Sequence, residues 1–98
     1  MEKNIITVKC KLSEKESNWS EDLTQQLRSN VLDYLNFGLQ EFGWCVAKAT
    51  HTYINHNRVI TFKFKTAVDI SGIDLNALEK TVKTGQQGVF YLDDVTVK

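Results

Sequence analysis

The middle of the chain, residues 44–66, has the sequence WCVAKATHTYINHNRVITFKFKT. Its second half, residues 58–66, alternates apolar and polar side chains with a period of two, which is typical of a β-strand with one buried face. The Asn-His-Asn sequence at residues 55–57 separates it from a first half that is rich in Val, Ala, Thr and Tyr. Because asparagine tolerates the positive φ of a tight turn, we predict a β-hairpin with arms at residues 44–54 and 58–66.

The first arm of the hairpin alternates less cleanly, so its buried face is predicted from size and charge. One face carries small or aromatic residues, and Lys48 lies on the other. We predict that the smaller residues face inward, because alanine lets a helix approach closely and because burying a lysine costs free energy. This inward face consists of Cys45, Ala47, Ala49, His51 and Tyr53.

Two further segments have the pattern of strands, one on each side of the hairpin. Residues 4–12 alternate cleanly, and the apolar side chains of this strand are those of Ile6, Val8, Cys10 and Leu12. Residues 89–97 are also strand-like, but their apolar parity changes at Asp93 and Asp94. A change of parity requires one extra residue, so we predict a β-bulge at this pair.

Two segments have the 3.6-residue period of helices. The first spans residues 20–42, with Asn18 or Ser20 as the N-cap and Gly43 as the stop. Its apolar stripe consists of Leu23, Leu27, Val31, Tyr34, Leu35, Gly38 and Phe42. The second helix is shorter: Ser71 and Asp74 resemble a capping box at its start, and Gly85 is placed to end it.

The order of these elements is β-α-β-β-α-β, which predicts an α+β fold in a single domain over residues 1–98. Right-handed crossovers combined with an antiparallel hairpin give the strand order 4-1-3-2. We therefore expect a ferredoxin-like sandwich, in which a four-stranded antiparallel sheet has two helices on one face and its other face open.

The amino-acid composition indicates the cellular compartment of the protein and its overall charge balance. Twelve basic and twelve acidic residues give a formal net charge of zero, so no overall field draws the chain to nucleic acid or to a membrane. Two cysteines without C-x-x-C spacing indicate neither a disulfide framework nor a metal site. The chain shows no signal peptide and no apolar run of membrane-spanning length. We expect a reduced, cytoplasmic protein that does not enter membranes.

The zero net charge conceals a segregated pattern. Residues 44–68 contain basic side chains and no acid, whereas residues 13–43 hold six acids against two basic residues. If the apolar rows of the strands face the helices, the open sheet face is lined by lysine and threonine, and Thr7 and Thr61 are exposed on it. Such lysines are expected to bind phosphates of a nucleic acid or nucleoprotein, or simply to solvate an exposed antiparallel face. The candidate nucleic-acid-binding residues are Lys9, Lys11, Lys48, Arg58, Lys63 and Lys65.

Two families with a similar strand order do not fit the residues. RNA-recognition motifs carry base-stacking aromatics on the open face of the sheet, but here Phe62 and Phe64 alternate into the core and the motif's glycine is missing. Acylphosphatases need an arginine in a glycine-rich loop after the first strand, and here that loop, residues 13–17, is Ser-Glu-Lys-Glu-Ser. We expect no enzyme activity, no catalytic residues, no metal and no cofactor.

The first helix offers a second hypothesis, a protein–protein interface. Four apolar residues lie at the margins of its stripe: Leu32, Leu39, Trp19 and Phe37. Exposed, they would grip another protein or a second copy of the chain; otherwise they are the margins of a broad buried stripe. The alternative function is therefore an inhibitor or adaptor, of the kind that phages and mobile elements encode against host defences, which acts through this margin or an edge strand. A homodimer is compatible with either hypothesis.

Overall fold

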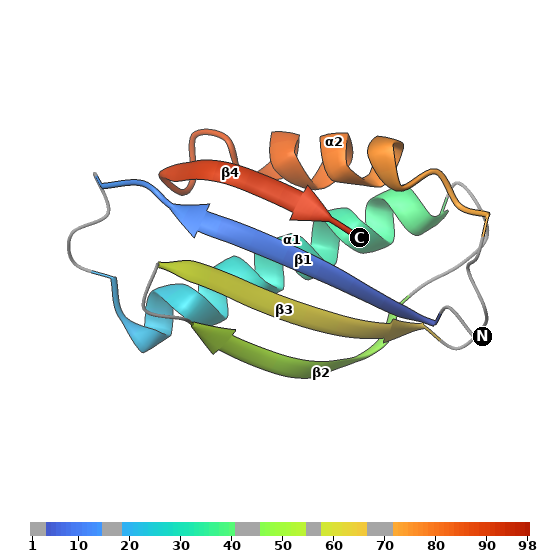
Figure 1. Ribbon diagram of the computed structural model, residues 1–98, viewed down its shortest axis with the longest axis horizontal. Helices are drawn as coiled ribbons and strands as arrows, with labels where there is room; N and C mark the ends of the chain where they lie inside the picture. The colour runs from blue at the N-terminus through green and yellow to red at the C-terminus, as the bar shows by residue number, and fades with distance from the viewer. Residues whose placement is uncertain (1–3, 15–18, 41–45, 55–57, 67–71) are drawn as a thin grey trace.

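The computed structural model of the chain describes residues 4–14, 19–40, 46–54, 58–66 and 72–98, and for residues 46–54 it describes the backbone alone. The elements are β1 (Ile5–Leu12), α1 (Glu21–Gln40), β2 (Val46–Ile54), β3 (Val59–Thr66), α2 (Leu75–Gln86) and β4 (Leu92–Val97). The strands are hydrogen-bonded in the order β2-β3-β1-β4, and each neighbouring pair is antiparallel (Figure 1). The chain has an α+β fold.

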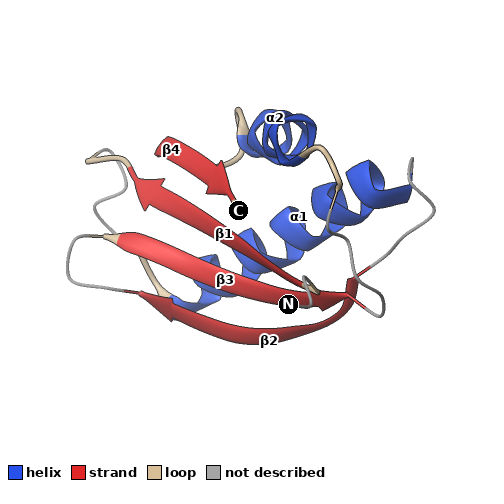
Figure 2. Ribbon diagram, turned by 45° about the vertical axis from the view of Figure 1, so that its right-hand side comes forward, coloured by secondary structure: helices blue, strands red, loops and turns tan. Residues whose placement is uncertain are grey.

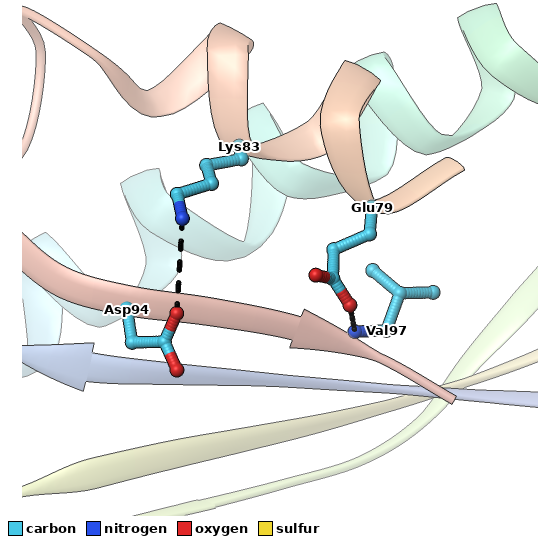
Figure 3. A network of polar contacts seen from close by, with 4 residues as sticks. All are labelled: Glu79, Lys83, Asp94 and Val97. Atoms are coloured by element: carbon cyan, nitrogen blue, oxygen red, sulfur yellow. Dashed lines mark hydrogen bonds and ion pairs between the residues drawn. The ribbon is translucent and has the colours of Figure 1, made fainter. Parts of the chain in front are cut away.

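The two helices are not placed as the sequence predicts. α1 lies behind the sheet, whereas α2 lies beyond β4, along the outer edge of the sheet (Figures 1 and 2). The backbone N–H of Val97 donates to Glu79 Oε2 of α2 at 3.1 Å, and Lys83 forms an exposed ion pair with Asp94 at 3.8 Å (Figure 3). The predicted ferredoxin-like sandwich, with two helices on one face of the sheet, is therefore wrong: one helix covers the face and the other closes an edge.

This edge contact has a clear physical reason. Lys98 and Thr7 exchange reciprocal backbone hydrogen bonds, so the N–H of the preceding residue, Val97, points away from β1. An unpaired strand edge is a template for unwanted pairing with other chains. The Glu79 carboxylate accepts a hydrogen bond from one backbone N–H of this edge, that of Val97, and α2 covers this side of β4.

The core lies between the sheet and the helices. The alternate residues of β1 and β3 that were predicted to face inward are 0–4% exposed, which confirms the predicted buried faces of these two strands. The rings of Phe62 and Phe64 lie 6.2 Å apart between centroids. Burial raises the pKa of the Cys10 thiol to about 12, so this cysteine is protonated and unreactive at neutral pH. Cys45 lies outside the described residues.

The N-terminus of α1 follows the prediction, but its buried stripe does not. The hydroxyl of Ser20 accepts from the backbone N–H of Leu23 at 3.2 Å, as an N-cap does. Leu39 is fully buried, and Tyr34, which the sequence placed in the stripe, is 38% exposed. The stripe is shifted because α1 packs against α2 as well as the sheet. The buried residues of α1 are Thr24, Leu27, Val31, Leu35, Gly38 and Leu39.

The second helix differs from the prediction at both ends. Asp74 is its N-cap, since one carboxylate oxygen accepts from the N–H groups of Asn76 and Ala77; Ser71 lies outside the described residues. Gly85 lies inside the helix and does not end it. A Cβ at this glycine would lie 2.3 Å from the ring of Tyr34, so the glycine permits close contact between α1 and α2.

The last strand is shorter than predicted and contains the predicted bulge. Its register against β1 shifts between Lys11 and Leu12, where Asp94 and Leu92 are the respective partners, which confirms the bulge at Asp93–Asp94. The strand begins at Leu92 and not at residue 89. The preceding Phe90 instead packs beside Trp19, with ring centroids 6.4 Å apart.

The register of β2 against β3 shifts twice, between Val46 and Lys48 and between Ala49 and His51. A strict period of two therefore does not hold along this strand. The predicted inward face of the first hairpin arm concerns side chains that lie outside the described part of the chain, as do Trp44 and the turn at residues 55–57.

Candidate nucleic-acid interface

Five lysines line the face of the sheet that is turned away from α1, and we call this set the lysine face. Side chains alternate between the two faces of a strand. Since the intervening residues of β1, β3 and β4 are buried in the core, these lysines point to the opposite side. Four of them are exposed and Lys63 is half-buried. The lysine face consists of Lys9, Lys11, Lys63, Lys65 and Lys98.

The register arranges three of these lysines around one threonine. Thr7 of β1 lies opposite Lys63 of β3 on one side and opposite Lys98 on the other. Lys9 is the next residue along β1 on the same face, about 7 Å further on. It pairs with Thr61 and Thr96, so each cross-strand neighbour of Lys9 is uncharged. Between β1 and its two neighbouring strands, like charges are thus diagonal instead of directly opposite, an arrangement that avoids the destabilisation of facing cations.

A shallow hollow of about 190 Å³ lies on this face, across β3, β1 and β4. Lys9 and Lys11 line it, together with Val59, Thr96 and Asp94. Asp94 is the acid that the described residues contribute to this face, and it lies opposite Lys11 in the register. Its carboxylate also pairs with Lys83 of α2. The positive charge is therefore greatest away from Asp94, around Lys9, Lys63, Lys65 and Lys98.

Two predicted residues of the nucleic-acid site are not part of the lysine face as the structure describes it. The backbone of Lys48 in β2 pairs with that of Lys65, but the side chain of Lys48 lies outside the described part. Arg58 precedes β3 at the end of the sheet, has a φ of 63° and donates from Nη2 to the carbonyl oxygen of Ser13 at 3.1 Å. It holds the chain ends of β1 and β3 together.

Lys98 was not predicted to lie on this face, and Thr61 is less exposed than predicted. Once the bulge is counted, Lys98 alternates in phase with Asp94 and Thr96 and therefore lies on the same face as they do. This alternation in the sequence could have predicted its position. Thr61 was expected to be exposed on the open face but is only 3% exposed. Its short side chain lies in the middle of the sheet, between β1 and β2, where the flanking strands shield it.

Besides the lysines, the residues of β1, β3 and β4 on this face are Ile5, Thr7, Val59, Thr61, Asp94 and Thr96, and none of them is aromatic. Stacking of bases on aromatic rings is worth about 1–3 kcal/mol per base in proteins that bind single strands. These three strands can therefore offer ammonium groups to phosphates, and a threonine hydroxyl as a hydrogen-bond partner, but no stacking platform.

The four residues of the predicted protein–protein interface on the first helix are not exposed together. Leu39 is fully buried, and Leu32 and Trp19 are partly buried against the core. The indole N–H of Trp19 donates to the hydroxyl of Thr24 at 2.7 Å. Phe37 is exposed, with 64% of its surface accessible. Three of the four residues pack within the fold, because the buried stripe of α1 is broader than its sequence pattern indicates.

Other kinds of site find no support in the described residues. They contain no group of three or more His, Cys, Asp or Glu side chains arranged to hold a metal ion. Neither α1 nor α2 combines the length and apolarity that crossing a membrane requires. Comparison of the chain with protein-family models, with curated proteins and with solved structures finds no match.

Proposed function

We propose that this chain is a small, non-enzymatic cytoplasmic protein that binds nucleic acid through the phosphate backbone, using the lysine face. The observation that carries the proposal is the register, which brings lysines from β1, β3 and the end of β4 onto one side of the sheet. Net charge alone argues against such binding, because the whole chain is neutral. The arrangement of the charges argues for it, since a local cluster attracts phosphates within roughly 10 Å even when the total is zero.

The spacing of the lysines suits a regularly charged strand. Successive residues on one face of a β-strand lie about 7 Å apart. Neighbouring phosphates of one DNA strand rise by about 3.4 Å along the axis, and because the strand also winds around the axis, the distance between them is larger than this rise. Lys9 and Lys11 can therefore meet neighbouring phosphates, and Lys63 and Lys65 on β3 can do the same one strand away.

The absence of aromatic rings among the residues of β1, β3 and β4 on this face favours a duplex without sequence preference as the ligand. Affinity then comes from release of condensed counterions, and dissociation constants of about 10–100 μM are expected at physiological salt. The simpler alternative is that these lysines only keep an exposed sheet face hydrated. The two hypotheses differ in whether any salt-dependent complex forms.

Fluorescence anisotropy with a labelled duplex, measured between about 50 and about 200 mM salt, tests the proposal. If all five lysines contact phosphates, the logarithm of the association constant should fall with the logarithm of salt with a slope of about −4.5, so affinity drops roughly 500-fold across that range. A shuffled duplex of the same length should give the same curve. The absence of binding at the lowest salt concentration would contradict the proposal and would mean that the lysines only keep the sheet face hydrated.

A further inference from the structure

An apolar hollow of about 290 Å³ lies between α1 and α2 and has no role in the proposed nucleic-acid site. Tyr34 and Phe37 line it from α1, and Lys80, Thr81 and Thr84 line it from α2. Phe37 is 64% exposed and Tyr34 is 38% exposed. Two neighbouring exposed aromatic rings beside a hollow are typical of a surface that is covered by a partner.

The two sides of this groove carry opposite charges. Asp33 lies one helical turn before Phe37, so both side chains project from the same outward part of α1. Lys80 lies on the opposite side, on α2. Both charged residues are exposed, and neither forms an ion pair in the part of the chain that the structure describes.

A surface with an acid on one side and a base on the other is complementary to itself. The helices run antiparallel across the groove, because Tyr34 lies against Gly85 while Gly38 lies against Leu78. A two-fold axis parallel to the groove would lay α1 of one copy over α2 of the other. α1 of each copy, which carries Asp33, would then lie over α2 of its partner, which carries Lys80, and each Phe37 would enter the partner's hollow.

We propose that the occupant of this groove is a second copy of the same chain, bound through an isologous interface formed by α1 and α2. In such an interface every contact occurs twice, so one complementary charge pair is repeated on each side of the axis. α1 lies on the side of the sheet opposite the lysine face, and the dimer therefore leaves both lysine faces accessible. α2 is only about 18 Å long, so the interface falls at the small end of specific interfaces, and a dissociation constant on the order of 10–100 μM is expected.

The test uses two charge-reversal variants of the full chain, Asp33→Lys and Lys80→Asp, in sedimentation-velocity experiments over a range of concentrations. Each variant alone places like charges on the facing helices at both repeated contacts, and its self-association should weaken at least about tenfold. An equimolar mixture restores an opposite pair at both contacts, and it should form a heterodimer about as readily as the unmodified chain dimerises. Because both positions are exposed, circular dichroism should show unchanged folding.

Phe37→Ser serves as a second variant that does not depend on charge, and it should also abolish the dimer. A wild-type chain that remains monomeric at millimolar concentration would overturn the proposal. Two other results would equally overturn it: the dimer persists in both charge variants, or the two variants do not form a heterodimer when mixed. In either case the dimer would use another surface.

Discussion

Glutamate in place of both Lys9 and Lys65 is expected to weaken duplex binding by about 100-fold at physiological salt. Each phosphate contact contributes roughly fivefold to affinity there, and charge reversal adds repulsion to the loss of two contacts. Both lysines are exposed and lie on different strands, so the change removes charge from across the face without disturbing the core. Anisotropy titration of the variant against the unmodified chain measures the effect, and the salt slope should fall by about 2.

The matched control reverses two basic residues elsewhere, Arg28→Glu and Lys83→Glu, on α1 and α2. Starting from a formal charge of zero, this variant and the lysine-face variant both reach −4. If affinity depends on the lysine face, the control should bind within about threefold of the unmodified chain, because the Lys83 ion pair with Asp94 is exposed and contributes little. Equal loss in both variants would show that only net charge matters.

The largest expected effect on stability comes from Phe62→Ala, which should lower the free energy of unfolding by about 3–5 kcal/mol. Phe62 is fully buried in β3 and stacks on Phe64. Truncation therefore leaves a cavity between the sheet and α1 that neighbouring side chains cannot fill. The total free energy of unfolding of a domain of this size is only about 5–15 kcal/mol. The variant should therefore unfold at a much lower urea concentration, as measured by circular dichroism.

Phe37→Ala is the matched control for this stability prediction, since it makes the same chemical change at an exposed position. It should shift the free energy of unfolding of the monomer in dilute solution by no more than about 0.5 kcal/mol. If both substitutions cost the same, the assignment of the β3 core face would be incorrect.

The buried faces of β1 and β3 could be predicted from sequence because each strand keeps a strict period of two over its whole length. The same alternation predicted four of the five lysines on the open face. Lys98 was missed because the bulge before it changes the parity of the last strand. Thr61 was misjudged because alternation predicts the direction of a side chain, not how far its neighbours cover it.

The placement of the helices could not be predicted in the same way. A helix that covers a sheet and a helix that closes its edge have the same 3.6-residue pattern, because each buries one stripe. Gly85 has the usual signature of a helix stop, and only its contact with Tyr34, far away in sequence, shows that it serves close packing instead. The α1–α2 groove could not be predicted from the sequence for the same reason, since Phe37 and Lys80 come together only in three dimensions.

The central claim is that the described sheet face, and no other surface, contacts phosphate. A titration of ¹⁵N-labelled protein with a short duplex at low salt, followed by NMR, tests it most directly. The backbone amides of Thr7, Lys9, Lys63 and Thr96 should show the largest shifts, which should revert when salt is added. Shifts confined to α1 and α2, or no shifts at any duplex concentration, would contradict it.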